Sequence, residues 1–470
     1  MKKVVCVLIF IASVLLFSYV PVYAKEKDAN VKETENVAEI TVKETGKKIK
    51  FTSVNCESTI EYCYSAASGN GCYMALVNSD KGEEAYFGSK DGSFKRVDLA
   101  GLVKENFGLT EDDEISIDDV MYADKKFLVS GTYYEKTEED VPKYKEIFVV
   151  STKNCEKFNF YHIGGAEYYP YTMFKDEGLT YSIGFTYLQK VNGTFYVCLN
   201  THIQTLYPDG DEKPESYDYD IDCITGYYGT SLKKMKPVRL KESIKTELKD
   251  LSSVGMTCEY NFKENKVIQG LNIYPNMETV GESYISKTTN GKKWSKLEKT
   301  DEPIYEFNIY TASVIVEWPR NGQNRQKVTS ISGKGIRGFE AVLPTDELLS
   351  SCVFLLKEDE EKGLYYGGML AAVENDIYRV NSDSSVEKVK IPFTIEEGEN
   401  NFACINDMSL FTADGYLYMT KTDFDGLVRI PLPCSEEEFV DIDGTGNYLV
   451  IISNDRIYRV KGSKLAACFK

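Results

Sequence analysis

The sequence predicts an all-β protein folded as a β-propeller with seven or eight four-stranded blades. Apolar and polar residues alternate with a period of two along most of the chain, which is typical of strands with one buried face. In the last third, Tyr378, Tyr418 and Tyr458 lie in short strand-like segments, and successive tyrosines are 40 residues apart. Repeats of about 40 residues built from short strands are typical of propeller blades. An irregular pair of β-sandwiches is the alternative, and the regular spacing argues against it.

Strand–turn–strand units can be followed from these repeats back toward the N-terminus. With the three C-terminal repeats they make eight candidate hairpins, the upstream ones at Tyr86–Ser89, Ile147–Ser151, Tyr227–Thr230, Ser283–Ser286 and Lys327–Ser330. The last of these is the faintest, so the blade number is predicted as seven or eight. We expect a strand within Ala38–Phe51 to pair with the C-terminal blade and close the ring, which would remove exposed sheet edges. The best helical candidate is Lys241–Leu251, expected to be a short connector.

The N-terminus predicts export. Residues 1–24 contain Lys2 and Lys3, then a mainly apolar run, then Val22-Tyr23-Ala24 before a charged stretch, which is the order that signal peptidase recognises. We therefore expect a signal peptide over 1–24, with an uncleaved signal anchor as the alternative. Residues 25–48 are rich in Lys, Glu, Asn and Thr and predict a flexible leader. Residues 49–470 are then expected to form a single propeller domain.

The charge balance disfavours nucleic acid as a partner. The chain has 55 Lys and Arg against 73 Asp and Glu, a formal net charge of -18, and no basic cluster interrupts this acidity. Such a charge repels phosphate backbones. No second apolar stretch approaches membrane-spanning length, so apart from a retained signal anchor we expect no membrane contact. The expected product is a secreted or cell-surface monomer with an extracellular protein or glycan as its partner.

The cysteines are expected to be mostly free thiols in the core. Of 12 cysteines, Cys6 lies in the predicted signal peptide, and the odd number that remains leaves at least one thiol unpaired in a monomer. Several of the scattered cysteines fall within apolar strand-like runs, where the side chain behaves as a small hydrophobic group. A disulfide among Cys56, Cys63 and Cys72 is the alternative.

Three predicted hairpin turns carry residues similar to the Asp-box, the turn Ser/Thr-x-Asp-x-Gly-x-x-Trp/Phe. They are the segments Ser286–Trp294, Ser89–Gly92 and Ser151–Phe158. In such a turn a short polar side chain caps the backbone, glycine adopts a positive φ angle, and the aromatic ring packs beneath. On these turns the chain resembles the sialidase-like β-propeller superfamily. The resemblance implies the fold only, because in that family the box lies away from the catalytic centre.

No catalytic constellation is recognisable in the sequence. Arg429 lies in an Arg-Ile-Pro segment like that of sialidases, but near the end of the chain, and an exposed strand residue is the favoured interpretation. His162 and His202 are the only histidines, and neither accompanies a nucleophile elbow. Paired carboxylates could hydrolyse glycosidic bonds, but the many acidic residues prevent their selection from sequence alone. The catalytic residues therefore remain unknown at this level.

Calcium is the best cofactor candidate, although no cofactor is required. Asp441 and Asp443, and likewise Asp423 and Asp425, place carboxylates two residues apart beside glycine, and hard oxygen ligands suit Ca²⁺. Neither motif has the distal glutamate of a calcium loop, and Asp-Gly is also common in hairpin turns, so the turn is the favoured interpretation. Zinc is disfavoured because the chain has no Cys-x-x-Cys and no closely spaced histidine pair.

Tyrosines near the middle of the chain predict a recognition surface. The segment Leu206–Asp222 is interpreted as an excursion from one rim; it and the residues after it contain Tyr207, Tyr217, Tyr219, Tyr227 and Tyr228. Tyrosine on a rim loop gives a large amphipathic contact that loses little entropy on binding. We therefore expect a non-catalytic propeller that binds a protein or glycan partner. The alternatives are an extracellular glycoside hydrolase or lyase that uses funnel carboxylates and tyrosines, and a structural protein of the cell envelope.

Overall fold

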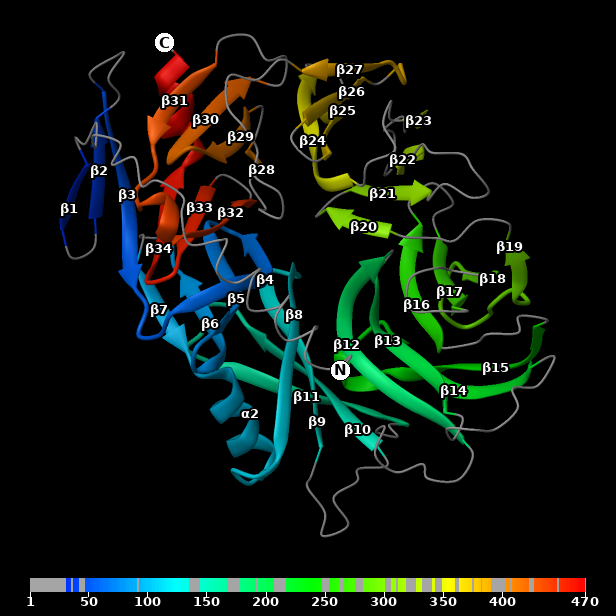
Figure 1. Ribbon diagram of the computed structural model, residues 1–470. Coiled ribbons are helices and arrows are strands. Elements are labelled where there is room, and N and C mark those ends of the chain that lie inside the picture. Colours follow the sequence, from blue (N-terminus) through cyan, green and yellow to red (C-terminus); the bar gives the residue numbers. More distant parts are fainter. Residues whose placement is uncertain are drawn as a thin grey trace, which may run out of the picture.

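The structure is a computed structural model of the chain. It describes the following residues, with only the backbone in parts of several strands: 31–34, 37–41, 47–90, 93–134, 144–167, 178–191, 193–206, 217–246, 253–261, 266–274, 282–300, 306–309, 312–317, 327–331, 340–342, 349–359, 363–373, 376–381, 383–389, 402–405, 408–421, 427–445 and 448–469. The described strands form antiparallel sheets that follow one another around a common centre in chain order (Figure 1). This is the β-propeller that the alternating pattern and the repeat predict.

Three sheets lie between residues 60 and 300. The first is β4 (Ile60–Gly69), β5 (Cys72–Ser79), β6 (Gly82–Gly88) and β7 (Phe94–Val97). The second is β8 (Glu114–Ala123), β9 (Lys126–Tyr134), β10 (Tyr144–Thr152) and β11 (Phe158–Glu167). The third has eight strands: β12 (Gly178–Val191), β13 (Thr194–Leu206), β14 (Tyr217–Gly229), β15 (Lys236–Thr246), β16 (Ser253–Asn261), β17 (Lys266–Tyr274), β18 (Glu282–Thr288) and β19 (Glu298–Thr300).

The chain after residue 300 continues the pattern. Three four-stranded sheets follow: β20 (Glu306–Ile309), β21 (Ala312–Glu317), β22 (Lys327–Ile331) and β23 (Glu340–Val342); β24 (Leu349–Asp359), β25 (Gly363–Val373), β26 (Asp376–Asn381) and β27 (Val386–Val389); β28 (Phe402–Ile405), β29 (Met408–Ala413), β30 (Tyr416–Lys421) and β31 (Val428–Pro431). The last sheet joins the two ends of the chain: β1 (Val31–Thr34), β2 (Val37–Thr41), β3 (Lys48–Asn55), β34 (Arg456–Lys461), β33 (Tyr448–Ser453) and β32 (Phe439–Thr445).

The number of blades depends on how the eight-stranded sheet is counted. It holds two consecutive sets of strands, β12–β15 and β16–β19, which are joined where β13 pairs with β16. If this sheet is counted as one blade, the propeller has seven blades, and if it is counted as two, the propeller has eight. The 40-residue repeat is confirmed as a structural repeat, because Tyr378, Tyr418 and Tyr458 are buried in the third strands of their sheets, β26, β30 and β34.

The N-terminal strand β3 closes the ring, as predicted. It pairs with β34 in antiparallel register from Thr52 opposite Arg459 to Asn55 opposite Arg456, while β2 pairs with its other edge. The strands β1 and β2 lie within residues 25–48, so part of the segment that was predicted to be a flexible leader is built into the sheet. The closure ties the first described strands to the last sheet and removes one exposed edge on each.

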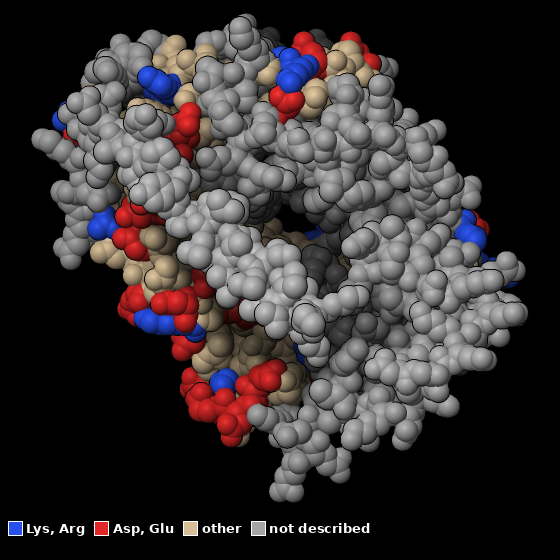
Figure 2. All heavy atoms as spheres, in the orientation of Figure 1, with Lys and Arg blue, Asp and Glu red and all other residues tan. Residues whose placement is uncertain are grey.

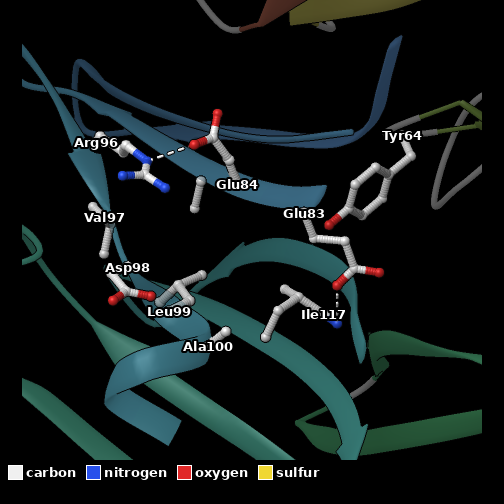
Figure 3. Close-up of a pocket in the computed structure, with 10 residues that line it drawn as sticks. Tyr64, Glu83, Glu84, Arg96, Val97, Asp98, Leu99, Ala100 and Ile117 are labelled. Atoms are coloured by element: carbon white, nitrogen blue, oxygen red, sulfur yellow. Dashed lines mark hydrogen bonds and ion pairs between the residues drawn. The ribbon is translucent and has the colours of Figure 1, made fainter. Parts of the chain in front are cut away.

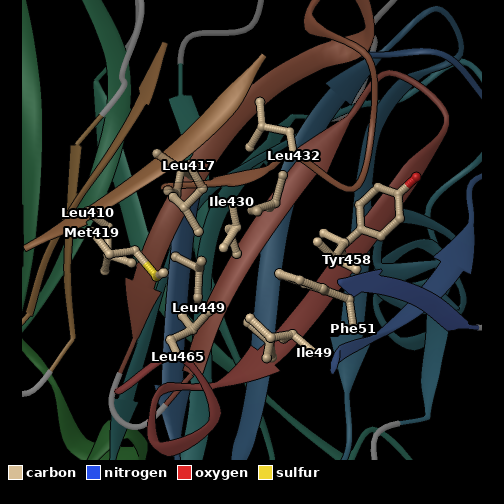
Figure 4. Packing of buried hydrophobic residues seen from close by; sticks show 14 of the residues in the cluster. Ile49, Phe51, Leu410, Leu417, Met419, Ile430, Leu432, Leu449, Tyr458 and Leu465 are labelled. Carbon is tan, nitrogen blue, oxygen red and sulfur yellow. The ribbon is translucent and has the colours of Figure 1, made fainter. Parts of the chain in front are cut away.

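The hydrophobic core lies between neighbouring sheets. Figure 4 shows the cluster where the last sheet packs against β28–β31, with Phe51, Leu417, Leu449 and Tyr458 among its fully or nearly fully buried members. Similar clusters of buried hydrophobic residues lie between β4–β7 and β8–β11, and between β8–β11 and β12–β15. The sheets β4–β7 and β8–β11 have a neighbour on both faces, so both sets of alternate side chains are buried along most of the strands β5 and β9.

The described helices are short, and the prediction of one of them was wrong. The helix α2 (Leu99–Phe107) follows β7; Asp98 caps it by accepting a hydrogen bond from the backbone N–H of Gly101, 2.8 Å away. The others are α3 (Gly462–Ala466) and the 3-10 turns η2 (Leu232–Lys234), η3 (Glu436–Glu438) and η4 (Ala467–Phe469). The candidate Lys241–Leu251 is a strand instead over its first part, because β15 extends to Thr246 and pairs with β14. In the described part of the chain no helix combines the length and apolar character needed to cross a bilayer.

Two of the Asp-box-like turns share one geometry. After β18, the Thr288 hydroxyl accepts the backbone N–H of Gly291 at 3.0 Å, and Gly291 has φ +72°. After β10, the Thr152 hydroxyl accepts the backbone N–H of Cys155 at 2.8 Å, and Cys155 has φ +55°. A polar side chain caps each turn and a residue with positive φ follows, as predicted. The capping threonine lies three positions before the residue with positive φ, whereas the Asp of an Asp-box lies two positions before its glycine. The third turn, at Ser89–Gly92, lies partly outside the described residues.

The cysteines whose side chains the structure describes are free thiols. Cys56, Cys63 and Cys72, the three that were considered for a disulfide, are unbonded and partly buried. Burial raises the pKa of Cys56 and of Cys155 to about 12, and it also raises the pKa of Cys63 well above its usual value. A thiol with a raised pKa is protonated at neutral pH and reacts slowly, which is typical of a structural rather than a catalytic cysteine.

Candidate functional site

The first strands of neighbouring sheets lie side by side around the centre. The strand β4 contacts β32 on one side and β8 on the other, and β8 contacts β12 (Figure 1). Each of these strands contains β-bulges, between Ile60/Tyr62 and Cys63/Ser65 in β4, Ile117/Asp119 in β8, Ile183/Thr186 in β12 and Phe439/Asp441 in β32. A bulge redirects the side chains beside it and is frequent next to functional sites. The polar residues at these bulges are therefore the first place to look for a site.

Four residues beside the bulges of β4 and β8 form what we call the Tyr62 face: Tyr62, Tyr64, Glu83 and Asp118. Tyr62 is 53% exposed, and its ring lies edge-on to that of Tyr64, with 6.3 Å between the ring centroids. The Tyr64 hydroxyl is buried beside Glu83 and has no hydrogen-bond partner among the described residues (Figure 3). Burial and the nearby charges of Glu83 and Asp118 raise the pKa of Tyr64, so this hydroxyl stays protonated and can donate a hydrogen bond.

The two carboxylates of the Tyr62 face differ in how firmly they are held. Asp118 accepts hydrogen bonds from the Ser116 hydroxyl at 2.5 Å and from the backbone N–H and hydroxyl of Thr186 at 3.0 and 2.9 Å, so it joins β8 to β12. Burial nevertheless raises its pKa to about 6. Glu83 is exposed and accepts the backbone N–H of Ile117 at 2.8 Å, and desolvation raises its pKa. Glu83 is therefore the carboxylate with more freedom to contact a ligand.

Asp119, next to Asp118, serves the structure. One carboxylate oxygen accepts the Ser65 hydroxyl at 2.8 Å, and the other accepts the backbone N–H of Leu188 at 2.9 Å. Its side chain thus links β8 to β4 on one side and to β12 on the other. Because Asp118 and Asp119 both bridge neighbouring sheets, they fix the relative position of the strands that carry the Tyr62 face.

A small pocket lies beneath the Tyr62 face, at the start of α2 (Figure 3). Its volume of about 20 Å³ is enough for a water molecule only. Glu84 lies in its wall with a side chain 1% exposed, forms an ion pair with Arg96 at 2.6 Å, and accepts hydrogen bonds from Ser58 and Tyr86. A buried carboxylate with this many partners anchors the wall of the pocket rather than binding a ligand.

A second acidic group lies on the other side of β4. Asp441 and Asp443 are in the strand β32, and their charges contribute to the raised pKa of the Cys63 thiol, which shows that the three side chains are neighbours. Burial, and then the charge of Asp443, raises the pKa of Asp441 to about 8. With no cation bound, Asp441 is therefore mostly protonated at neutral pH.

The structure places only part of the predicted metal sites. Asp441 and Asp443 lie in a strand and not in the hairpin turn that the Asp-Gly sequence indicated, while Asp423 and Asp425 lie outside the described residues. Among the residues that the structure describes, no three His, Cys, Asp or Glu side chains gather where they could hold a metal ion. The possible calcium site stays a prediction.

The predicted recognition tyrosines are dispersed. Tyr207 lies outside the described residues, and Tyr217 and Tyr219 lie in the strand β14, where only the backbone is described. Tyr227 is 5% exposed and donates its hydroxyl to the carbonyl of Gly165 at 2.6 Å, so it belongs to the core between sheets. Tyr228 is half-buried against the turn at Gly291. The backbone over Tyr217–Gly229 is strand, and the recognition surface around Leu206–Asp222 stays a prediction.

The remaining candidate residues have ordinary surface positions. Arg429 is exposed, and its guanidinium lies over the ring of Tyr416 at 4.8 Å from the centroid, as expected for an exposed strand residue. His162 is exposed in β11, with its Nε2 2.7 Å from a carboxylate oxygen of Glu146. His202 lies in β13, where its side chain is not described. None of these residues lies in the Tyr62 face.

Sequence reasoning missed the Tyr62 face because its members come from three strands. One signal could have indicated it: the run Tyr62-Cys63-Tyr64 and the pair Asp118-Asp119 interrupt the alternation of their strands with large or charged residues. In Figure 2 acidic side chains gather over the described part of the lower left, where Figure 1 places β4–β8 and α2.

Comparisons with known proteins give fold resemblance only. No protein-family model matches the chain, and no curated protein matches its sequence. Among solved structures, the chain is similar to a virginiamycin B lyase from Staphylococcus aureus, with 10% identity, 88% of this chain and 99% of the other covered, and a TM-score of 0.34. It is also similar to an ulvan lyase of polysaccharide lyase family PL25, with 10% identity, 92% of this chain and 100% of the other covered, and a TM-score of 0.38. For BamB from Moraxella catarrhalis the identity is 8%, the coverage is 74% of this chain and 98% of the other, and the TM-score is 0.31. Similarity at this level does not indicate a shared activity.

Proposed function

We propose that this chain is a secreted, non-catalytic β-propeller that binds a glycan through the Tyr62 face. The observation that carries the proposal is the 53% exposed ring of Tyr62 on a strand that is fixed on both sides. An aromatic ring in the open offers an apolar surface on which the apolar face of a sugar ring can stack. Because the ring is on a strand and not on a loop, binding costs little conformational entropy.

The polar groups beside the ring complement sugar hydroxyls. The protonated Tyr64 hydroxyl is a donor, and the exposed Glu83 carboxylate is an acceptor. A few placed polar groups beside an apolar contact surface are typical of small-ligand sites. Since the nearby charges at Glu83 and Asp118 are negative, the face favours neutral or amine-bearing sugars over acidic ones.

The hydrogen bonds of the carboxylates argue against a catalytic role. Asp118 and Asp119 accept hydrogen bonds across the sheets, so each is committed to holding neighbouring strands. A general acid or base must reach the proton that it transfers, and the raised pKa of Tyr64 keeps that hydroxyl from acting as a base near neutral pH. These properties support binding without turnover.

A glycan array probed with the chain that begins at residue 25, with and without Ca²⁺, tests the proposal. Tyr62→Ala should abolish binding to the recognised glycans, while Leu427→Ala, which trims another exposed large hydrophobic residue at 39% exposure, should leave it unchanged. No specific binding by the parent chain, or equal binding by Tyr62→Ala, would reject the Tyr62 face as a glycan site. Silence on all glycans would favour a protein partner or a structural role in the cell envelope.

One observation favours a glycan-active enzyme as the second candidate. Glu83 and Asp118 have raised pKa values, and a carboxyl group that holds its proton toward neutral pH can serve as a general acid. In that case, glycans bound by the array would be cleaved, which a reducing-end assay detects. Turnover that Asp118→Asn abolishes, with binding retained, would replace the binding proposal by the enzyme.

A further inference from the structure

A larger pocket lies between β8–β11 and β12–β15, away from the Tyr62 face. Its volume is about 220 Å³. Its apolar wall comes from Leu128 of β9, Phe195 of β13 and Leu232 of η2, which belong to the core between these sheets, and from the partly buried ring of Tyr161 of β11. Because its floor is made of packed strands, the pocket is formed before any ligand binds.

The side chains at the mouth of the pocket make it basic. Lys126 and Lys233 line it, and neither forms an ion pair with any of the described residues. The Asp124 carboxylate, which also lines it, is neutralised by an ion pair with Lys190, whose ammonium group lies 4.7 Å from the centre of the Phe195 ring. A pocket with two uncompensated lysines on a chain with a net charge of -18 is a local attraction for anions.

A buried hydroxyl completes the pocket. Ser151 of β10 is 1% exposed, lines the pocket, and its hydroxyl has no hydrogen-bond partner among the residues that the structure describes. It lies opposite Leu128 in the register of β9 and β10, so the two side chains share the face that packs toward β12–β15. A buried hydroxyl without a partner is costly, and a ligand oxygen that accepts its hydrogen bond would recover that cost.

From these three features we infer that the pocket binds a small organic carboxylate with a single flat, apolar ring. The ring would lie against Tyr161 and Phe195, the carboxylate would face Lys126 and Lys233, and a carboxylate oxygen could accept the Ser151 hydroxyl. The volume lies below the roughly 300 Å³ at which pockets for drug-sized ligands begin, so one ring fits and a longer chain does not. This site does not depend on the proposed glycan binding, because no residue of the Tyr62 face lines it.

Titration of the whole chain with benzoate tests the inference, with benzyl alcohol as the probe without charge and acetate as the probe without a ring. Isothermal calorimetry should show one benzoate bound per chain, at least tenfold tighter than either probe. The double variant Lys126→Gln, Lys233→Gln should weaken benzoate about five- to tenfold, since it removes two partly exposed charge contacts. Ser151→Ala should weaken it roughly three- to tenfold through the lost hydrogen bond.

The control variant is Lys292→Gln, which removes an exposed lysine on the turn after β18. It should bind benzoate as the parent chain does, and so should Tyr62→Ala. Circular dichroism on each variant separates lost binding from lost folding, and the lysine variants change only side chains at the mouth of the pocket. The inference is overturned if benzoate shows no saturable binding, if benzyl alcohol binds equally well, or if the double lysine variant binds as tightly as Lys292→Gln.

Discussion

Replacing Asp441 by asparagine should stabilise the protein, and most strongly at alkaline pH. Burial and the charge of Asp443 raise the pKa of the Asp441 carboxyl from 3.8 to about 8. The folded protein therefore holds this proton more tightly than the unfolded chain does. Proton binding by Asp441 therefore contributes to the free energy of unfolding. This contribution is fully present below the pKa of the unfolded chain, near 3.8, and is lost as the pH rises through about 8. Asparagine keeps the oxygen that accepts the backbone N–H of Ile442 at 2.7 Å, and it cannot ionise.

The size of the effect follows from the pKa change. Each unit of pKa corresponds to about 1.4 kcal/mol, so the raised pKa of Asp441 lowers the free energy of unfolding by roughly 6 kcal/mol at pH 9. At pH 5 most of the cost has been removed by protonation, and the difference between parent and variant should fall to about 1–2 kcal/mol. The pH dependence of this difference, rather than its value at one pH, is the signature of a raised pKa.

Urea denaturation of the parent chain and of Asp441→Asn at pH 5, 7 and 9 measures the difference. Asp112→Asn, which changes an exposed carboxylate before β8, is the matched control and should leave the midpoint unchanged at every pH. A constant difference between parent and Asp441→Asn across the three pH values, or a variant less stable than the parent at pH 9, would refute the placement of Asp441 in a buried site next to Asp443.

Three further substitutions test the packing. Gly291→Ala should lower the free energy of unfolding by about 2 kcal/mol, because Gly291 has φ +72° and a Cβ there would lie 2.6 Å from the Tyr228 ring; an unchanged urea midpoint would contradict the turn. Tyr227→Phe should lower it by about 1–2 kcal/mol through the lost hydrogen bond to Gly165, with glycan binding retained; a binding defect in a folded variant would make Tyr227 a contact residue. Phe51→Ala should lower it by about 3–5 kcal/mol, since Phe51 is fully buried in the strand that closes the ring; a small shift of the melting temperature would place that strand outside the core.

The repeated sheets and the closure of the ring could be predicted from patterns in the sequence. The tyrosines at 378, 418 and 458 occupy equivalent buried positions in successive sheets, because one strand position recurs in each repeat. The ring closure by β3 followed from an alternating segment before the first blade and a last blade in need of a partner. The first inference used a spacing that recurs along the chain, and the second used alternation within one segment.

Other features depend on contacts that are distant in the sequence. Lys241–Leu251 was the best local candidate for a helix, but the pairing of β15 with β14 over Lys241–Thr246 outweighs the local preference. The helix α2 was missed because it buries only Leu99 and Val103, too few residues for a clear helical period. Asp118 binds Thr186, 68 residues away, and such a contact leaves no pattern in either segment. The Tyr62 face is of the same kind, because β4, β6 and β8 each supply part of it.

The ratio of glycan affinities between Tyr62→Ala and the parent chain tests the central proposal most directly. It is measured by calorimetry with the strongest ligand from the array, and Leu427→Ala serves as the reference. Loss of a stacking ring should weaken binding by roughly 1–3 kcal/mol, or about five- to 150-fold, without change in the thermal stability of the chain. Affinities equal within error for Tyr62→Ala, Leu427→Ala and the parent would contradict the proposal and place the glycan elsewhere on the propeller.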